Sequence, residues 1–204
     1  MTEASGSARV RMGAVVLAAG QSRRMGQPKL VLPWGDRTVI EWIVGELERA
    51  GTDEIVVVTG AARELVETAL SGAVVKLVHN PDFARSEMTT SLQIGIRALD
   101  PSLDALLIAL GDQPTIEQAV ARQIIDAFQT RRARLVIPSY QMRRGHPWLV
   151  ERSLWAALLA MPPEETMRDF LHTYADQIEY VNVDSPGILK DLDTPEDYQR
   201  LRPG

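Results

Sequence analysis

Short apolar runs recur along this chain, and longer stretches of mixed apolar and polar residues separate them. The runs at 55–58 and 105–110 are continuously apolar, which is typical of parallel strands that are buried on both faces. By the same reasoning we predict strands at residues 13–18, 54–59, 74–78, 105–110, 135–138 and 178–182.

The stretches between these strands have the spacing of amphipathic helices. In the one that starts at Ile116, the apolar residues Ile116, Val120 and Ile124 fall on one helical face. A last helix is expected to begin near Pro195, because Thr194 is a good N-cap and proline is favoured at the first helical position. The other predicted helices cover residues 39–50, 63–70, 91–99, 116–130 and 153–160.

Strands that alternate with helices predict an α/β fold with a mostly parallel sheet. In such sheets ligands bind beyond the carboxyl ends of the strands, so functional residues should come directly after strands. The length of 204 residues and the lack of repeats or linkers favour one domain. We expect residues 1–12, which are mostly small and polar, to be a disordered leader, and residues 13–204 to form the domain.

Composition excludes several classes of protein. The chain has no cysteine, so disulfides, thiolate catalysis and cysteine-based metal sites are excluded. A net charge of −5 argues against a general nucleic-acid binder. No stretch approaches the roughly 20 apolar residues that span a bilayer, and no signal peptide is recognisable. We therefore expect a cytoplasmic protein with neither a nucleic acid nor a membrane as partner.

The segment from Leu17 to Lys29 follows a predicted strand and reads Leu-Ala-Ala-Gly-Gln-Ser-Arg-Arg-Met-Gly-Gln-Pro-Lys. Its small residues let the backbone approach a ligand, and Arg23, Arg24 and Lys29 supply positive charge, so it is suited to hold phosphates. It matches neither Gly-x-x-x-x-Gly-Lys-Ser/Thr nor Gly-x-Gly-x-x-Gly. The alternative is an ordinary turn with basic surface residues.

Acidic residues at two places are candidates for a metal site. Asp112 follows the apolar run 105–110 in the sequence Gly-Asp-Gln-Pro, and a carboxylate there can bind Mg²⁺ and bridge to substrate phosphates. The alternative is an Asx-type turn. Asp191 and Asp193 alternate along an extended segment, so either can complete a site with Asp112. The alternative interpretation of this segment is structural: the end of a strand followed by a helix cap.

Two further segments have candidate chemistry. The turn at 143–147, Arg-Arg-Gly-His-Pro, could face an anionic acceptor, although a lone histidine such as His146 is more often structural. The segment 87–91, Glu-Met-Thr-Thr-Ser, precedes a helix and contains the hydroxyls of Thr89 and Ser91. These hydroxyls could contact a nucleobase, or they could only cap the helix.

Together these segments resemble the MobA-like nucleotidyltransferase family, and within it the molybdenum cofactor cytidylyltransferases. The family motif Leu-Ala-Ala-Gly-x-Ser-x-Arg-Met-Gly-x-x-Lys matches at every defined position from Leu17 to Lys29. Gly-Asp-x-Pro at 111–114, Gly-His-Pro at 145–147 and the acidic segment 191–197 are similar to later landmarks of the family, in the same order. The Gly-His-Pro form looks more like the cytidylyl branch than the guanylyl branch.

The resemblance implies a three-layer αβα sandwich of the nucleotide-diphospho-sugar transferase type, with a Rossmann-like sheet and a divalent cofactor, Mg²⁺ or alternatively Mn²⁺. It implies that the nucleotide contacts Leu17, Ala18, Ala19, Gly20, Arg24, Gly26, Lys29, Thr89 and Ser91. It implies a catalytic set of Arg24, Lys29 and Asp112, and metal ligands Asp112 and Asp191, with Asp191 favoured over Asp193. The acceptor is expected to contact Gln113 and His146. Family members often have Gly-Met-Ser-Ser-Ser where this chain has residues 87–91, a departure that keeps hydroxyls but leaves the base preference open.

The implied activity is transfer of CMP from CTP to the phosphate of molybdopterin, with release of pyrophosphate and a molybdoenzyme as a transient partner. Three alternatives remain from the sequence. One is the same chemistry with GTP or with another phosphorylated acceptor, such as a sugar phosphate. Another is a nicotinamide-dependent oxidoreductase, because the family includes a nicotine blue reductase and a fold does not fix a function. The third is a non-catalytic partner of a molybdenum enzyme.

Overall fold

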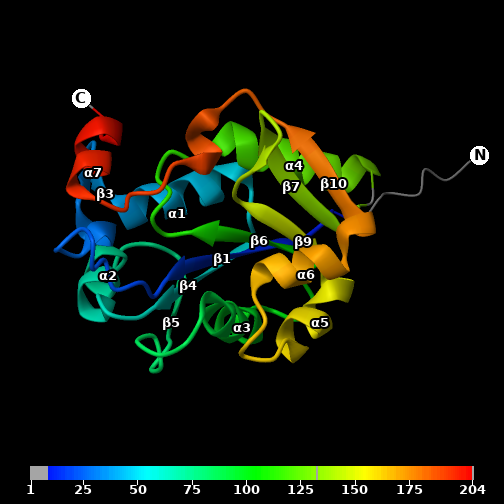
Figure 1. Cartoon of the computed structure of the whole chain (residues 1–204), viewed down its shortest axis with the longest axis horizontal. Coiled ribbons are helices and arrows are strands. Elements are labelled where there is room, and N and C mark those ends of the chain that lie inside the picture. Colours follow the sequence, from blue (N-terminus) through cyan, green and yellow to red (C-terminus); the bar gives the residue numbers. More distant parts are fainter. Residues whose placement is uncertain (1–8, 132, 204) are drawn as a thin grey trace, which may run out of the picture.

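A mixed sheet runs through the middle of the protein, which we describe from a computed structural model for residues 9–131 and 133–203 (Figure 1). Its strands lie in the order β10–β7–β9–β6–β1–β4–β5. They span Met12–Ala18 (β1), Glu54–Thr59 (β4), Lys76–His79 (β5), Ala105–Leu110 (β6), Leu135–Tyr140 (β7), Trp148–Glu151 (β9) and Ile178–Asn182 (β10). Each predicted strand is present. In this order β9 runs antiparallel to both of its neighbours, and the other neighbouring pairs are parallel.

The sequence does not predict β9, because it has only three consecutive apolar residues, 148–150, directly after the turn at 143–147. It is reached from β7 through a hairpin in which the short strand β8 (Arg143–Arg144) pairs back onto β7. A second small hairpin of β2 (Pro33–Trp34) and β3 (Arg37–Thr38) leads into the first helix. Both hairpins are short and do not interrupt the pairing of the parallel strands.

Helices cover both faces of the sheet, as Figure 1 shows. The core on one face includes residues of α1 (Val39–Ala50), α2 (Arg63–Ala69) and α4 (Gln118–Arg131). The core on the other face includes residues of α3 (Met88–Ala98), α5 (Trp155–Ala160) and α6 (Met167–Thr173). Neighbouring residues of β1 point to opposite faces, so Val16 belongs to the first core and Val15 to the second. The expected three-layer αβα fold is confirmed.

Capping boxes start three of the helices. The side chains of Thr38, Thr166 and Thr194 each accept a backbone N–H at the start of α1, α6 and α7 (Pro195–Leu201), respectively. The predicted cap at Thr194 is therefore confirmed, whereas α6 is a short helix of seven residues that the sequence does not predict. Short 3₁₀ turns lie at Lys29–Val31, Arg152–Leu154, Ala175–Gln177 and Pro186–Leu189. In the part of the chain that the structure describes, no helix is long and apolar enough to cross a bilayer.

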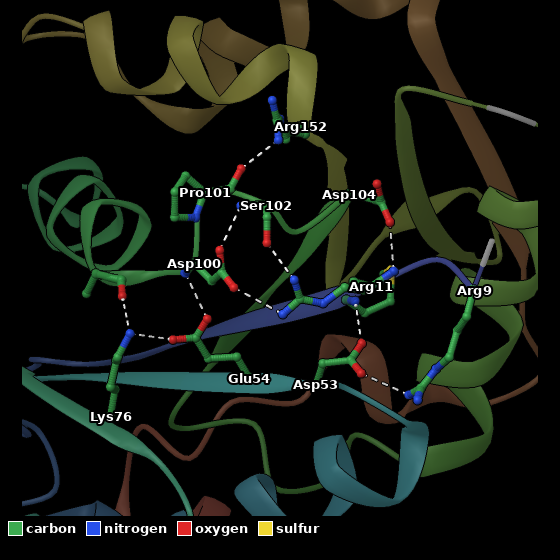
Figure 2. A network of polar contacts seen from close by, with 12 residues as sticks. Arg9, Arg11, Asp53, Glu54, Lys76, Asp100, Pro101, Ser102, Asp104 and Arg152 are labelled. Atoms are coloured by element: carbon green, nitrogen blue, oxygen red, sulfur yellow. Dashed lines mark hydrogen bonds and ion pairs between the residues drawn. The ribbon is translucent and has the colours of Figure 1, made fainter.

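At the amino ends of the parallel strands, charged side chains tie together segments that are far apart in the sequence (Figure 2). Asp53 Oδ2 accepts the backbone N–H of Met12 at 2.8 Å, and Asp104 Oδ2 accepts that of Arg11 at 2.7 Å. The Arg11 guanidinium also donates to Asp100 Oδ2 at 3.1 Å. We call Arg9, Arg11, Asp53, Glu54, Lys76, Asp100, Ser102, Asp104 and Arg152 the amino-end network.

This network corrects one expectation about the start of the chain. Residues 1–8 of the expected leader lie outside the described residues. Residues 9–12 are ordered, because Arg9 donates to Asp53 Oδ1 at 2.9 Å and Met12 is a buried residue of β1. The expectation of a disordered leader is therefore wrong for residues 9–12, where ion pairs and strand pairing hold the backbone.

Candidate active site

A cavity of about 490 Å³ lies beyond the carboxyl ends of β1 and β6, the edge of the sheet at which the sequence predicts the site. The loop after β1, the turn at Lys29–Val31, the segment before α3 and the residue Asp112 contribute to its wall. Of the residues expected to contact the nucleotide, the wall contains Leu17, Ala18, Ala19, Gly20, Arg24, Lys29 and Ser91. Gly26 and Thr89 are not among its lining residues.

The loop after β1 folds back on itself around Ser22. The backbone N–H groups of Met25 and Gly26 both donate to the Ser22 carbonyl at 3.1 Å, and the Lys29 N–H donates to Ser22 Oγ at 3.3 Å. Gly26 has φ +69°, a conformation that favours glycine. Gly26 therefore shapes the loop without lining the cavity.

Close backbone packing brings the neighbouring loops together. A Cβ on Gly60, after β4, would lie 2.3 Å from the Ala19 carbonyl oxygen. A Cβ on Gly111 would lie 2.9 Å from the Leu17 carbonyl oxygen, which accepts the Gly111 N–H. Only glycine permits these approaches, and the second one sets Asp112 beside the loop after β1.

The centre of positive charge in the cavity is Lys29, which is only 8% exposed. Its Nζ lies 2.7 Å from Asp112 Oδ2 and 3.3 Å from Asp193 Oδ1. The guanidinium of Arg24, which is largely exposed, lies 2.9 Å from Asp193 Oδ2. Two cations from the segment Leu17–Lys29 and two carboxylates from two other parts of the chain thus form one cluster at the cavity wall.

The carboxylates of Asp112 and Asp193 suit a divalent cation. Both present oxygens to the same ammonium group, and carboxylate oxygens are the ligands that Mg²⁺ and Mn²⁺ prefer in proteins. Within residues 9–131 and 133–203, no three histidine, aspartate or glutamate side chains are already grouped as a metal site. A metal ion bound here would share the two carboxylates with Lys29.

Asp191 and Asp193 differ in what they contact. Asp193 lines the cavity, whereas Asp191 does not and accepts a hydrogen bond from Gln113 Nε2 at 2.5 Å. Partial burial raises the pKa of Asp191, the hydrogen bond from Gln113 opposes this, and the charge of Asp112 raises the pKa further. The sequence favours Asp191 as the second metal ligand, but the structure places Asp193 against Lys29 and the cavity.

The wall formed by the segment before α3 and by the first turn of α3 contains residues with hydroxyl and apolar side chains. Ser91 lines the cavity as expected, and so does Ser86, which the sequence analysis does not single out. The Thr89 residue is 3% exposed, and its hydroxyl donates to the Glu165 carbonyl at 3.2 Å. Thr89 is thus turned to the α5–α6 connection, and its expected contact with the nucleotide has no support in the structure.

The two residues expected at the acceptor side are both enclosed. Gln113 is 4% exposed, and His146 stacks on Trp148 with ring centroids 4.5 Å apart. Gln113 Oε1 and His146 Nε2 are buried and have no hydrogen-bond partner among the described residues. Burial lowers the pKa of His146 to about 4, so its imidazole is neutral at pH 7. Neither residue lines the cavity.

Comparison with known proteins gives a family and several relatives. The family model for the MobA-like NTP transferase domain matches residues 14–178. The molybdenum cofactor cytidylyltransferase of Escherichia coli (strain K12) is 29% identical over 90% of this chain and 92% of its own length. The nicotine blue oxidoreductase of Paenarthrobacter nicotinovorans is 28% identical over 92% of this chain and 94% of its own length. These two relatives are about equally similar to the chain.

Two solved structures resemble the protein closely. A nucleotidyl transferase from Methanothermobacter has a TM-score of 0.80 and 30% identity, and the match covers 94% of this chain and 96% of that one. A Mycobacterium tuberculosis protein that was crystallised with manganese has a TM-score of 0.78 and 27% identity, over 95% of this chain and 98% of that one. Each match covers nearly the whole of both chains.

Proposed function

Because this chain belongs to the MobA-like NTP transferase family, we propose that it transfers CMP from CTP to the phosphate of molybdopterin and releases pyrophosphate. The observation that carries this proposal is the cluster of Lys29, Arg24, Asp112 and Asp193 at the cavity wall. Both cations belong to the glycine-containing segment Leu17–Lys29 after β1 and line the cavity, so a triphosphate bound by this segment would contact both of them. The cytidylyltransferase relative supports the choice of substrates.

The reaction needs positioning and charge neutralisation more than covalent help. A phosphate oxygen of the acceptor attacks the α-phosphorus of the nucleotide, the bond from that phosphorus to the bridging oxygen breaks, and pyrophosphate leaves. A phosphate monoester is largely dianionic near pH 7, so no general base is required. Lys29 and Arg24 bind the triphosphate and neutralise charge on the leaving pyrophosphate.

Asp112 and Asp193 would hold a divalent metal ion, for which we propose Mg²⁺. Such an ion would supply charge neutralisation at the phosphates, and the similar protein that was crystallised as a complex with manganese supports the choice of a divalent ion. Asp191 is a candidate for a further ligand. Gln113 would then act by holding Asp191 through its 2.5 Å hydrogen bond.

A second candidate function is a nicotinamide-dependent oxidation or reduction on the same scaffold. The nicotine blue oxidoreductase favours it, because it is almost as similar to this chain as the cytidylyltransferase. The cationic loop after β1 can bind the phosphates of either kind of nucleotide. The two functions therefore differ in the ligand and the reaction rather than in the scaffold.

Ligand-dependent thermal stability separates these functions. We would measure melting temperatures with CTP, GTP, ATP and NADPH, each with Mg²⁺ and with Mn²⁺, and then pyrophosphate release with molybdopterin as acceptor. A ligand at 100 times its dissociation constant stabilises the fold by about 2.7 kcal/mol. The proposal expects a shift with CTP and acceptor-dependent release of pyrophosphate. A shift with NADPH and with none of the nucleoside triphosphates would overturn it.

A further inference from the structure

The loop after β1 contains a contact between Gln21 and Arg23, two residues at undefined positions of the motif in Leu17–Lys29. We propose that Arg23, oriented by Gln21, binds the terminal phosphate of the nucleotide, so that the site distinguishes a nucleoside triphosphate from its diphosphate. This inference rests on the proposed function and adds a binding residue to it. The motif gives neither residue a role, so the proposal depends on side chains that are particular to this chain.

The backbone of Ser22 brings the side chains on both sides of it together. Ser22 has φ +50°, a left-handed conformation that is uncommon for residues other than glycine. Its carbonyl accepts the N–H groups of Met25 and Gly26 at 3.1 Å, and its Oγ accepts the N–H of Lys29 at 3.3 Å. Ser22 and both of its neighbours line the cavity. Residues that are held in such strained conformations are concentrated at ligand sites.

The hydrogen bond to Gln21 orients the guanidinium of Arg23 and leaves its outer edge open. Arg23 Nε lies 3.0 Å from Gln21 Oε1. An Nε–H group can only donate, so the amide atom that faces it must be the oxygen. In the part of the chain that the structure describes, Nη1 and Nη2 of Arg23 have no hydrogen-bond partner. Arg23 therefore presents a fork of N–H donors at the cavity wall, a geometry that can bind two oxygens of one phosphate.

Arg23 also differs from the two other cations of this wall in its charge balance. Lys29 contacts the carboxylates of Asp112 and Asp193, and Arg24 contacts that of Asp193. Two carboxylates thus balance the charges of Lys29 and Arg24. Within the described residues, Arg23 makes no ion pair, and its side-chain contact is to a neutral amide. Arg23 therefore supplies a positive charge that no carboxylate of the protein offsets.

The terminal phosphate is the group of a nucleotide that best matches this cation. Like a phosphate monoester, it has a second ionisation with a pKa of about 6, so it carries more negative charge at pH 7 than an internal phosphate does. Under the proposed function, the α-phosphorus reacts beside Asp112 and Asp193. Arg23 contacts neither aspartate, so it is available to the phosphate that is farthest from the reacting atom. The 2′-phosphate of NADPH is a terminal phosphate too, and the experiment therefore includes it.

The test compares dissociation constants for CTP, GTP and their diphosphates, measured by calorimetry for the whole chain with Mg²⁺. Arg23→Gln should weaken triphosphate binding about tenfold, because it removes charge-assisted hydrogen bonds. Diphosphate binding should change less than about twofold, since the missing phosphate is the one that Arg23 contacts. Arg85→Gln is the matched control. It removes the same charge from an exposed position near the cavity that does not line it, and it should leave both constants unchanged.

Variants of Gln21 test the orienting contact. Gln21→Ala keeps the charge of Arg23 but removes its hydrogen-bond partner, and should weaken triphosphate binding about threefold. Gln21→Glu gives Arg23 a carboxylate partner, so it should weaken triphosphate binding at least as much as Arg23→Gln does. Arg23→Lys keeps the charge without the fork and should fall between wild type and Arg23→Gln. All these side chains lie at the surface of one loop, so melting curves without ligand should match that of wild type.

The outcomes separate this inference from the proposed function. Equal losses for triphosphate and diphosphate in Arg23→Gln, or equal losses in Arg23→Gln and Arg85→Gln, would show that Arg23 acts only through general charge. The inference would then be wrong, and the proposed nucleotidyl transfer would stand. If wild type binds NADPH and no nucleoside triphosphate, the proposed transfer fails, and a loss of affinity for NADPH but not for NADH in Arg23→Gln assigns Arg23 to the 2′-phosphate. If wild type binds none of these ligands, both proposals fail.

Discussion

The strand β1 runs between two charged clusters that are built differently. At its amino end, the carboxylates of Asp53 and Asp104 accept backbone N–H groups at 2.8 and 2.7 Å. At its carboxyl end, Lys29 contacts the side chains of Asp112 and Asp193. The amino-end network bonds carboxylates to backbone N–H groups of the sheet as well as to other side chains, whereas the carboxyl-end cluster bonds side chains to one another.

This difference assigns a role to each cluster: the amino-end network stabilises the fold, and the carboxyl-end cluster is available to bind ligands. A hydrogen bond from a strand N–H to a carboxylate fixes the chain, and a ligand cannot replace it without opening the sheet. Side-chain ion pairs can change partners when a phosphate or a metal ion arrives, and exposed pairs contribute little to stability. We therefore expect substitutions at the carboxyl end to alter turnover and substitutions at the amino end to alter unfolding.

The largest expected effect is that of Asp112→Asn at the carboxyl end. It removes a charge beside the reacting phosphates, so metal-dependent turnover should fall at least about a hundredfold. The fold should be retained, because the substituted amide has nearly the same volume as the carboxylate and Lys29 keeps its contact with Asp193. Rates of pyrophosphate release and a denaturation curve check both parts. Turnover close to that of wild type would remove Asp112 from the metal site.

Lys29→Ala should weaken nucleotide binding or turnover about tenfold or more, since it removes the buried cation at the cavity wall. Lys76→Ala is the matched control. Lys76 belongs to the amino-end network, where it donates to Glu54 Oε1 at 2.6 Å and to the Ala98 carbonyl at 2.9 Å. The control variant should keep the turnover of wild type. Equal losses in both variants would mean that the two clusters do not have separate roles.

The sequence predicts the carboxyl-end cluster better than the amino-end network. The loop from Leu17 to Lys29 is one continuous motif, and Asp112 follows a recognisable strand, so both can be located from local pattern alone. Local sequence pattern could not decide whether Asp191 or Asp193 is the second candidate metal ligand. Leu192 between them is fully buried, both aspartates flank it, and only the tertiary contact with Lys29 distinguishes them.

Long-range contacts explain the other misses. Arg11 and Asp104 are 93 positions apart. The strand β9 has only three consecutive apolar residues, and its place between β6 and β7 follows from the hairpin that precedes it.

Asp53→Ala tests the amino end directly. It leaves the N–H of Met12, a residue only 1% exposed, without its acceptor, which should lower the free energy of unfolding by about 1–3 kcal/mol. Turnover at a temperature where the variant is folded should match wild type. Asp126→Ala, on the exposed side of α4, is the control and should change stability by less than about 0.5 kcal/mol. A large loss of turnover in folded Asp53→Ala would contradict the purely structural role.

Acid should first lower the stability of the fold through His146, which lies outside both clusters and follows the short strand β8. Burial lowers its folded pKa to about 4 from 6.5, so the neutral imidazole favours folding above pH 6.5. As the pH falls towards 4 the unfolded chain binds the proton first, and the free energy of unfolding falls by up to about 1.4 kcal/mol per pH unit. His146→Gln should flatten this part of the stability curve. An unchanged slope between pH 6.5 and 4 would mean that His146 titrates normally.

The smallest expected effect on stability is that of Asp100 in the amino-end network, and it appears at a lower pH than the effect of His146. Hydrogen bonds from the backbone and side chain of Ser102, and then from Arg11, lower the pKa of Asp100 from 3.8 to about 2. A folded pKa below the unfolded value means that the carboxylate stabilises the fold above pH 3.8, and that this contribution is lost as the pH falls through about 2. Asp100→Asn should therefore be less stable than wild type at pH 6, and the difference in melting temperature should shrink below pH 3.8. A difference that already disappears between pH 6.5 and 4 would contradict the lowered pKa of Asp100.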